Sequence, residues 1–170
     1  MHHEEIAVSA VDRPIVKLTP GHAKRARAGH PWIFSNEIAM DAAAKSLPKG
    51  TVVMIEDAGG EKLGVALFNP HSLIAARILD RDPRAAIDRD FIAARLRAAQ
   101  ALREQFFARP FYRLVHAEAD GLPGLVVDRY GDVVAVQANT AGMDLLLPVV
   151  IGALEAVLGP RVIVLKNASA

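Results

Sequence analysis

The first half of the chain alternates short apolar runs with polar or glycine-containing breaks. Runs rich in β-branched and aliphatic residues occupy positions 15–18, 51–56, 63–68 and 74–79. Runs of this length and composition predict β-strands, and the loop 57–60, which contains two glycines, predicts a hairpin. The one helical signal is 23–28, which is followed by Gly29, a residue typical of the position just past a helix end. One short helix among closely spaced strands predicts a small β-barrel.

The pattern changes after the charged, proline-containing segment 80–83. Apolar positions then recur at helical spacing, at Phe91, Ile92, Leu96, Ala99, Leu102 and Phe106, with Asp88 as the expected N-cap. Further strands are predicted at 112–117, 125–130, 133–138 and 161–166, and a helix at 144–158 with Pro148 in its first turn. The chain is therefore predicted to be α+β in two parts, with a loose tail at 1–13, a barrel at 14–83 and a mixed domain at 84–170.

Composition narrows the chemistry available to the chain. Its 170 residues are 52% hydrophobic and carry a formal net charge of +1, so only the distribution of charge can indicate nucleic acid. Because the sequence contains no cysteine, it forms no disulfide, thiolate metal site or cysteine nucleophile. The amino terminus is polar and acidic, unlike a secretory signal, and the longest apolar stretch, 145–158, is too short to span a bilayer. We therefore expect a soluble, cytoplasmic protein.

Charge is unevenly placed along the second half. Residues 84–113 contain seven arginines against three acids, whereas residues 114–132 contain four acids against one arginine. Arginine forks suit phosphate contacts, and so does the smaller cluster Lys24, Arg25 and Arg27. The alternative is a solvated surface whose charges pair within the protein. The sequence leaves both interpretations open.

Three other groups of residues have a functional and a structural interpretation. His116, Glu118 and Asp120 alternate and would share one face of a strand, as metal ligands do, but they also fit an acidic strand end, and we expect no metal site. The segment 121–124 has the spacing of a GxxG backbone clamp, but its position between strands favours a tight turn. Trp32 and Phe34 are placed to stack on bases, but we expect them in the barrel core.

Two segments together resemble one family. Gly29-His30-Pro31-Trp32-Ile33-Phe34-Ser35-Asn36-Glu37-Ile38 follows the basic helix, and Glu118-Ala119-Asp120-Gly121-Leu122-Pro123-Gly124-Leu125-Val126-Val127-Asp128-Arg129-Tyr130-Gly131-Asp132 lies further along. In order and spacing they resemble segments of the bacterial large-subunit (23S) ribosomal RNA cytosine-C5 methyltransferases, a class I S-adenosylmethionine-dependent family. The resemblance covers residues 14–167, and the second segment is the more specific.

The resemblance implies a PUA-like RNA-binding barrel, a mixed α+β middle domain and a Rossmann-type domain that binds S-adenosylmethionine and holds a catalytic cysteine. The 170 residues contain neither a glycine-rich strand-to-helix turn with its acidic ribose anchor nor a cysteine, so the third domain is expected to be missing. We therefore expect the chain to bind no cofactor and to have no catalytic residue of its own. Residues 162–167 resemble the entry into the missing domain, and the pattern departs at Ala168.

The resemblance and the charge pattern together predict the function. We expect an RNA-binding, substrate-orienting region whose partner is ribosomal RNA, with phosphate contacts from Lys24, Arg25, Arg27 and Arg77. We expect the loop Asp120, Gly121, Leu122, Pro123 and Gly124 to face the missing catalytic domain, and the C-terminal third to self-associate. The alternatives are a free-standing RNA-binding adaptor and a protein–protein interaction module.

Overall fold

The computed structural model describes residues 13–166. The predicted tail, apart from residue 13, and the departure at Ala168 lie outside these residues. The chain folds as two units that divide between residues 86 and 87. Among the described residues we call 13–86 the barrel unit and 87–166 the α+β unit.

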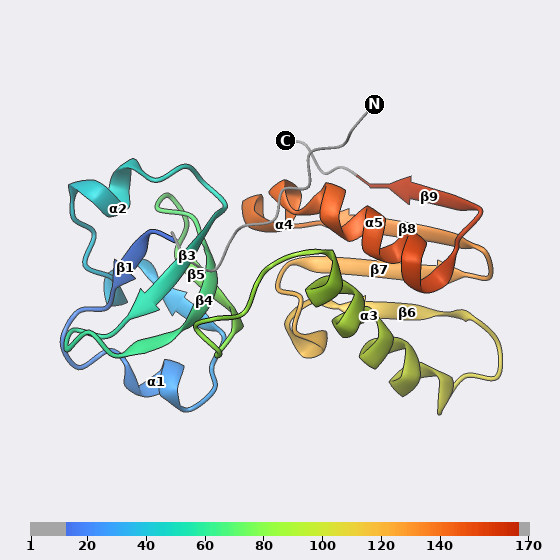
Figure 1. The fold of residues 1–170 in the computed structure, drawn as a ribbon, viewed down its shortest axis with the longest axis horizontal. Coiled ribbons are helices and arrows are strands. Elements are labelled where there is room, and N and C mark those ends of the chain that lie inside the picture. Colours follow the sequence, from blue (N-terminus) through green and yellow to red (C-terminus); the bar gives the residue numbers. More distant parts are fainter. Residues whose placement is uncertain (1–12, 167–170) are drawn as a thin grey trace. The chain divides into compact units, whose positions relative to one another are not determined.

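The barrel unit is built on one curled five-stranded sheet (Figure 1). Its strands, in the order in which they pair, are β1 (Ile15–Lys17), β3 (Thr51–Glu56), β4 (Lys62–Phe68), β5 (Ile74–Asp80) and β2 (Trp32–Phe34). Three short helical turns accompany them: α1 (Lys24–Arg27), η1 (Ser35–Glu37) and α2 (Ala42–Ser46). The strands predicted in this half are confirmed, whereas β2 and α2 were not predicted.

The two edges of this sheet are joined just beyond strands β1 and β2. The Thr19 N–H donates to the Glu37 carbonyl at 2.9 Å, and the Ala39 N–H donates to the Lys17 carbonyl at 2.8 Å. These bonds draw the curled sheet toward a barrel, and apolar side chains fill its interior. Ile33 is among them, at 2% exposure.

The expectation that Trp32 and Phe34 belong to the barrel core is wrong, because both side chains are only half-buried. The physical reason is strand alternation: neighbouring residues of a strand point to opposite faces. Because Ile33 takes the inward position, its two aromatic neighbours take the outward one. This outward position fits the alternative that the sequence offered for Trp32 and Phe34, contact with RNA bases.

The α+β unit has a four-stranded sheet with helices on one face (Figure 1). Its strands, in pairing order, are β6 (Phe111–His116), β7 (Leu125–Tyr130), β8 (Val133–Ala138) and β9 (Val162–Leu165), the last pair being parallel. The helices are α3 (Arg89–Glu104), α4 (Ala141–Leu145) and α5 (Leu147–Leu158), and η2 (Ala117–Asp120) follows β6. The predicted two-residue turn between β7 and β8 is confirmed, with positive φ at Gly131.

Two helix predictions need correction. The helix predicted at 144–158 begins earlier and is broken: Thr140 accepts a hydrogen bond from the Met143 N–H and starts α4, and α5 restarts with Pro148 in its first turn, where the missing N–H is tolerated. Helix α3 ends before Phe106, whose side chain is 74% exposed rather than on the buried face. No helix of the described residues is long and apolar enough to cross a membrane.

Candidate nucleic-acid interface

The predicted RNA-binding residues of the barrel unit lie on α1 and on strand β5, which pairs with β2. Helix α1 is only four residues long, and the guanidinium of Arg81 stabilises its end by donating to the carbonyls of Ala26, at 2.6 Å, and Arg27, at 3.3 Å. A cation at the C-terminal end of a helix also complements its dipole. This contact fixes α1 beside β5 and so determines where its basic side chains lie.

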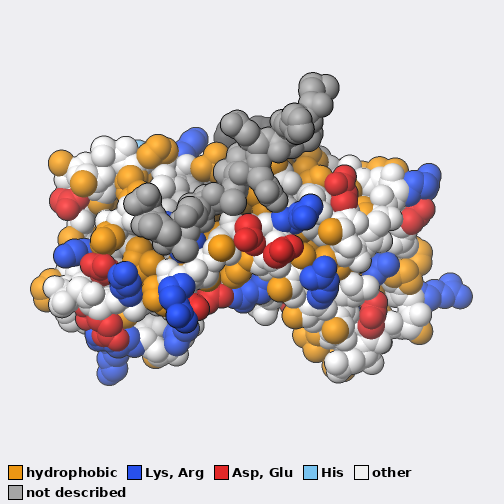
Figure 2. Space-filling model, viewed as in Figure 1, with side chains coloured by type: hydrophobic (Ala, Val, Ile, Leu, Met, Phe, Trp, Pro, Cys, Tyr) orange, Lys and Arg blue, Asp and Glu red, His pale blue; other side chains and the backbone are white. Residues whose placement is uncertain are grey.

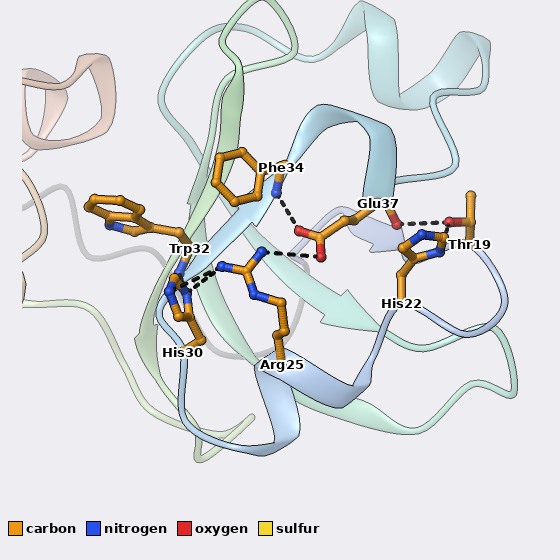
Figure 3. A network of polar contacts seen from close by, with 7 residues as sticks. All are labelled: Thr19, His22, Arg25, His30, Trp32, Phe34 and Glu37. Carbon is orange, nitrogen blue, oxygen red and sulfur yellow. Dashed lines mark hydrogen bonds and ion pairs between the residues drawn. The ribbon is translucent and has the colours of Figure 1, made fainter.

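Arg25 is held by three neighbours at once (Figure 3). One of its Nη atoms lies 3.5 Å from the Glu37 carboxylate, the other lies 3.1–3.2 Å from the ring nitrogens of His30, and its Cζ lies 5.0 Å from the centroid of the Phe34 ring. The side chain nevertheless stays 43% exposed. Arg25 is therefore a positioned cation with donors still facing solvent.

Glu37 is the acidic partner of Arg25 in this arrangement. It is only 7% exposed, and its Oε2 accepts a hydrogen bond from the Phe34 N–H at 2.7 Å. A carboxylate buried to this extent needs such donors, because an unpaired buried charge is costly. Glu37 thus ties β2 to η1 and fixes the position of Arg25. This role of Glu37 was not predicted. The available signal was its position three residues after Phe34 in the first family-like segment.

A second cation lies over a second aromatic ring on the same strand pair. Trp32 and Arg77 are cross-strand partners on β2 and β5, and the Arg77 Cζ lies 5.4 Å from the centroid of the Trp32 ring. The His30 ring meets Trp32 nearly at right angles, with centroids 5.9 Å apart. We call Arg25, His30, Trp32, Phe34 and Arg77 the β2 cluster. Two of the four predicted phosphate-binding residues therefore lie in one cluster with two aromatic rings.

The other two predicted residues differ from each other. Lys24 is exposed and forms no ion pair within the described part of the chain. Arg27 donates to both Glu61 and Asp57, the latter at 2.5 Å. The hydrogen bond that Arg27 donates to Glu61, together with the charges of both acids, raises the pKa of Arg27. Backbone N–H donors, together with Arg27, lower the pKa of Asp57. The charge of Arg27 is thus already compensated within the protein.

Acidic and basic side chains are interspersed on the face of the molecule shown in Figure 2. Affinity for RNA would then depend on particular side chains more than on a broad positive field, because exposed charges of opposite sign screen one another. The candidate interface is therefore the β2 cluster with Lys24, where cations and aromatic rings lie together.

The second family-like segment has a different role, in the interior of the α+β unit. The Asp120 side chain is 6% exposed and accepts from Arg103 of α3 at 2.7 Å and from the His116 N–H at 2.6 Å. On the sheet, Arg113 and Asp128 form a bidentate pair at 2.8 and 3.2 Å. The arginine-rich and acidic segments of the sequence are therefore folded onto each other, as the structural interpretation of the charge pattern expected.

The loop 120–124 packs within its own unit. Gly121 and Gly124 have φ values of +70° and +80°, and a Cβ atom on Gly124 would lie 2.5 Å from the Thr140 side chain that caps α4. Leu122 is fully buried. The tight-turn interpretation is confirmed, because both glycines adopt the left-handed conformation that such turns require. A role of this loop toward a catalytic domain stays a prediction.

The structure brings the candidate metal ligands of the sequence into a different geometry. Strand β6 ends at His116, and Ala117–Asp120 forms a 3-10 helix, so His116, Glu118 and Asp120 do not share a strand face. Between residues 13 and 166 no group of three or more potential ligands is placed to hold a metal ion.

The adjacent glycines Gly59 and Gly60 connect strand β3 to strand β4. Residues 13–166 contain no glycine-rich turn that enters a helix, which is the feature that S-adenosylmethionine binding of the Rossmann type needs.

Comparison with known proteins identifies the barrel. Residues 16–81 match the sequence profile of the PUA-like domain family. The barrel unit is a PUA-like domain. The chain is also homologous to proteins named ribosomal RNA large subunit methyltransferase I: it is 39% identical to the one from Shewanella denitrificans and 41% identical to one from Aliivibrio fischeri, over 132 residues in each case. These alignments cover 76% of this chain and 33% of each relative, so the chain spans about a third of the length of the curated relatives it matches.

The fold of the chain also recurs in solved structures. A Streptococcus mutans protein assigned as a SAM-dependent methyltransferase superposes with a TM-score of 0.72 at 15% identity, over 86% of this chain and 38% of that one. A second, a protein assigned as a methyltransferase and complexed with SAH, gives the same TM-score and identity over 90% of this chain and 40% of that one. At this identity the likeness shows that the PUA-like domain and the α+β unit occur together in larger proteins.

Proposed function

We propose that the chain is the RNA-binding and substrate-orienting region of an S-adenosylmethionine-dependent ribosomal RNA (cytosine-C5) methyltransferase. The observation that supports this most is the β2 cluster of the PUA-like domain, in a chain homologous to proteins named ribosomal RNA large subunit methyltransferase I. Arginine forks supply phosphate contacts, and half-exposed aromatic rings supply contacts to bases. Such a role places the chain in the cytoplasm with its ribosomal RNA.

The second part of the proposal is that these 170 residues orient RNA without transferring the methyl group. A cytosine-C5 transfer of this kind needs a thiolate nucleophile, and the sequence contains no cysteine. S-adenosylmethionine would bind to a Rossmann-type domain, which the family resemblance places after the mixed α+β domain. Incubation with labelled S-adenosylmethionine and ribosomal RNA should therefore leave the RNA unlabelled, and turnover above background would contradict this part.

RNA binding is tested by its salt dependence. Each phosphate contact releases counterions, so affinity for a ribosomal RNA fragment should fall steeply between about 50 and 200 mM salt. The double variant Lys24→Ala/Arg25→Ala should bind more weakly and with a shallower slope, reduced by about 1.4–1.8 for two lost contacts. The matched control is Lys45→Ala/Lys49→Ala, which removes the same charge at and just after α2, a helix at the opposite end of the barrel from α1 (Figure 1).

The outcomes of this experiment are distinct. An unchanged slope in the α1 variant, or an equal loss in the control, would count against α1 and the β2 cluster as the interface. Absence of binding at the lowest salt would count against the proposed function as a whole.

A second candidate function is supported by the α+β unit. The sheet face opposite its helices presents large apolar side chains that are 40–60% exposed: Phe111, Tyr130, Val162 and Val164. Clustered apolar exposure of this kind is typical of protein-binding surfaces. It favours a protein interaction made by the α+β unit, which is compatible with RNA binding by the barrel.

A further inference from the structure

The β2 cluster contains two cation–aromatic pairs side by side, which a purely phosphate-binding surface would not need. Arg77 lies over Trp32, and Arg25 lies over Phe34. Both rings belong to one strand, on the side opposite the buried Ile33. Flat π-systems with adjacent guanidinium groups are the elements with which proteins bind bases that are not stacked on neighbours.

We propose that the β2 cluster binds an unpaired RNA nucleotide, with its base stacked on the Trp32–Arg77 pair and its phosphate held by Arg25 and Lys24. This inference rests on the proposed function and names the form of RNA that the barrel recognises. Inside an A-form helix both faces of a base are covered by its neighbours. A ring on the protein therefore gains contact only with a base that has left the stack, in a loop, a bulge or a single strand.

The contacts around Arg25 support a preformed site. The buried Glu37 carboxylate and His30 hold the guanidinium from two sides, and the guanidinium lies over the Phe34 ring (Figure 3). A side chain already held in its bound geometry loses little conformational freedom when a ligand arrives. The guanidinium of Arg25 is thus held relative to the ring of Trp32, because His30 contacts both Arg25 and Trp32.

The chemistry of the β2 cluster does not distinguish one RNA base from another. Every base has a π-face, so stacking on a ring tolerates any sequence, whereas reading a base requires hydrogen bonds to its edge. The cluster offers cations and rings, and it therefore selects for an unpaired state more than for a particular base.

Trp32 is the only tryptophan of the chain, so its fluorescence reports on this site directly. The full chain is titrated with a mixed-sequence RNA of about 8 nucleotides, single-stranded or annealed to its complement, at low salt. We expect the single strand to quench Trp32 emission and to bind about ten-fold more tightly than the duplex. Equal affinity, or binding without any change in emission, would overturn the inference.

Variants separate stacking from charge. Removing a ring that stacks on one base weakens binding by about five- to one-hundred-fold. Trp32→Leu should therefore bind labelled single-stranded RNA at least five-fold more weakly and keep its duplex affinity, whereas Trp32→Phe, which retains a ring, should lose less. Phe106→Leu changes an exposed aromatic residue of the other unit and serves as the control.

The two proposals fail in different ways. If the wild-type chain binds RNA with steep salt dependence but Trp32→Leu leaves the preference for single strands unchanged, the stacked nucleotide is wrong and the proposed function stands. If neither RNA binds at low salt, both proposals fail. A thermal melt of each variant confirms that the barrel is folded. Because the fluorescence titration uses the wild-type chain, a misfolded Trp32→Leu protein still leaves that titration decisive.

Discussion

The barrel unit and the α+β unit both carry clusters of arginine, but they use them in different ways. In the α+β unit, Arg103 and Arg113, two residues of the most arginine-rich stretch of the chain, donate to Asp120 and Asp128 at 2.7 and 2.8 Å. In the barrel unit, Arg25 lies 3.5 Å from the Glu37 carboxylate and over the Phe34 ring. We therefore expect RNA contacts from arginines that lie beside aromatic rings, more than from arginines paired closely with carboxylates.

The same contrast holds for the two family-like segments. The segment 118–132 packs within its own unit: its glycines form a tight turn, its acids accept hydrogen bonds from arginines, and Leu122 lies in the core. The segment 29–38 puts Ile33 and Ile38 inward and leaves Trp32 and Phe34 half-exposed. We therefore expect substitutions in segment 118–132 to lower stability and substitutions in segment 29–38 to lower RNA affinity.

The largest effect on stability is expected for Gly124→Ala. A left-handed conformation costs an alanine about 1–2 kcal/mol, and the close approach to the Thr140 side chain adds about 1–3 kcal/mol of overpacking. The free energy of unfolding should fall by about 2–5 kcal/mol in a urea titration. Gly159→Ala is the matched control, because Gly159 has φ +53° with no atom within 4 Å of the added Cβ, and should cost about 1–2 kcal/mol. Equal losses would show that packing against Thr140 is unimportant.

A smaller effect is expected on association. The exposed face formed by Phe111, Tyr130, Val162 and Val164 should bring two copies of the chain together at high concentration, since burying apolar area is worth about 25 cal/mol per Å². Sedimentation velocity should detect dimers or larger species for the full chain and monomers for Val162→Lys/Val164→Lys. A wild-type chain that stays monomeric at high concentration would contradict this prediction.

The smallest effect distinguishes two neighbours on α1. Lys24→Ala should reduce the salt slope of RNA binding by about 0.7–0.9, the value for one phosphate contact. Arg27→Ala should reduce it by less than half of that, because Asp57 and Glu61 already compensate its charge. Asp57→Asn should make Arg27 more available and strengthen binding. If Arg27→Ala has the larger effect, the ion pairs do not persist when RNA binds.

Much of the fold was predictable because its signals are local. The strands 51–56, 63–68 and 125–130 and the helix beginning after Asp88 follow from composition, periodicity and a capping residue. The short strand β2 and the turn α2 were not predictable, because three to five residues carry too little periodicity. The start of α4 was not predicted, because the Thr140 side chain caps this helix before the apolar run begins at Leu145.

The candidate site was only partly predictable, for a physical reason. Lys24, Arg25, Arg27 and Arg77 were selected by residue type, but type alone does not show which charges find partners. Arg27 meets Asp57 and Glu61 from 30 and 34 residues away in the chain, and Arg77 meets Trp32 across two strands. The orientation of Trp32 and Phe34 followed from strand alternation, which the sequence shows only once β2 is known to be a strand.

One measurement compares the two units directly: ultraviolet crosslinking of the full chain to a ribosomal RNA fragment, followed by mapping of the crosslinked residues by mass spectrometry. If the β2 cluster and α1 form the interface, crosslinks should concentrate in residues 24–34, with Trp32 the most reactive site, and be sparse in residues 87–166. Crosslinks confined to residues 87–166 would contradict the assignment of RNA binding to the barrel.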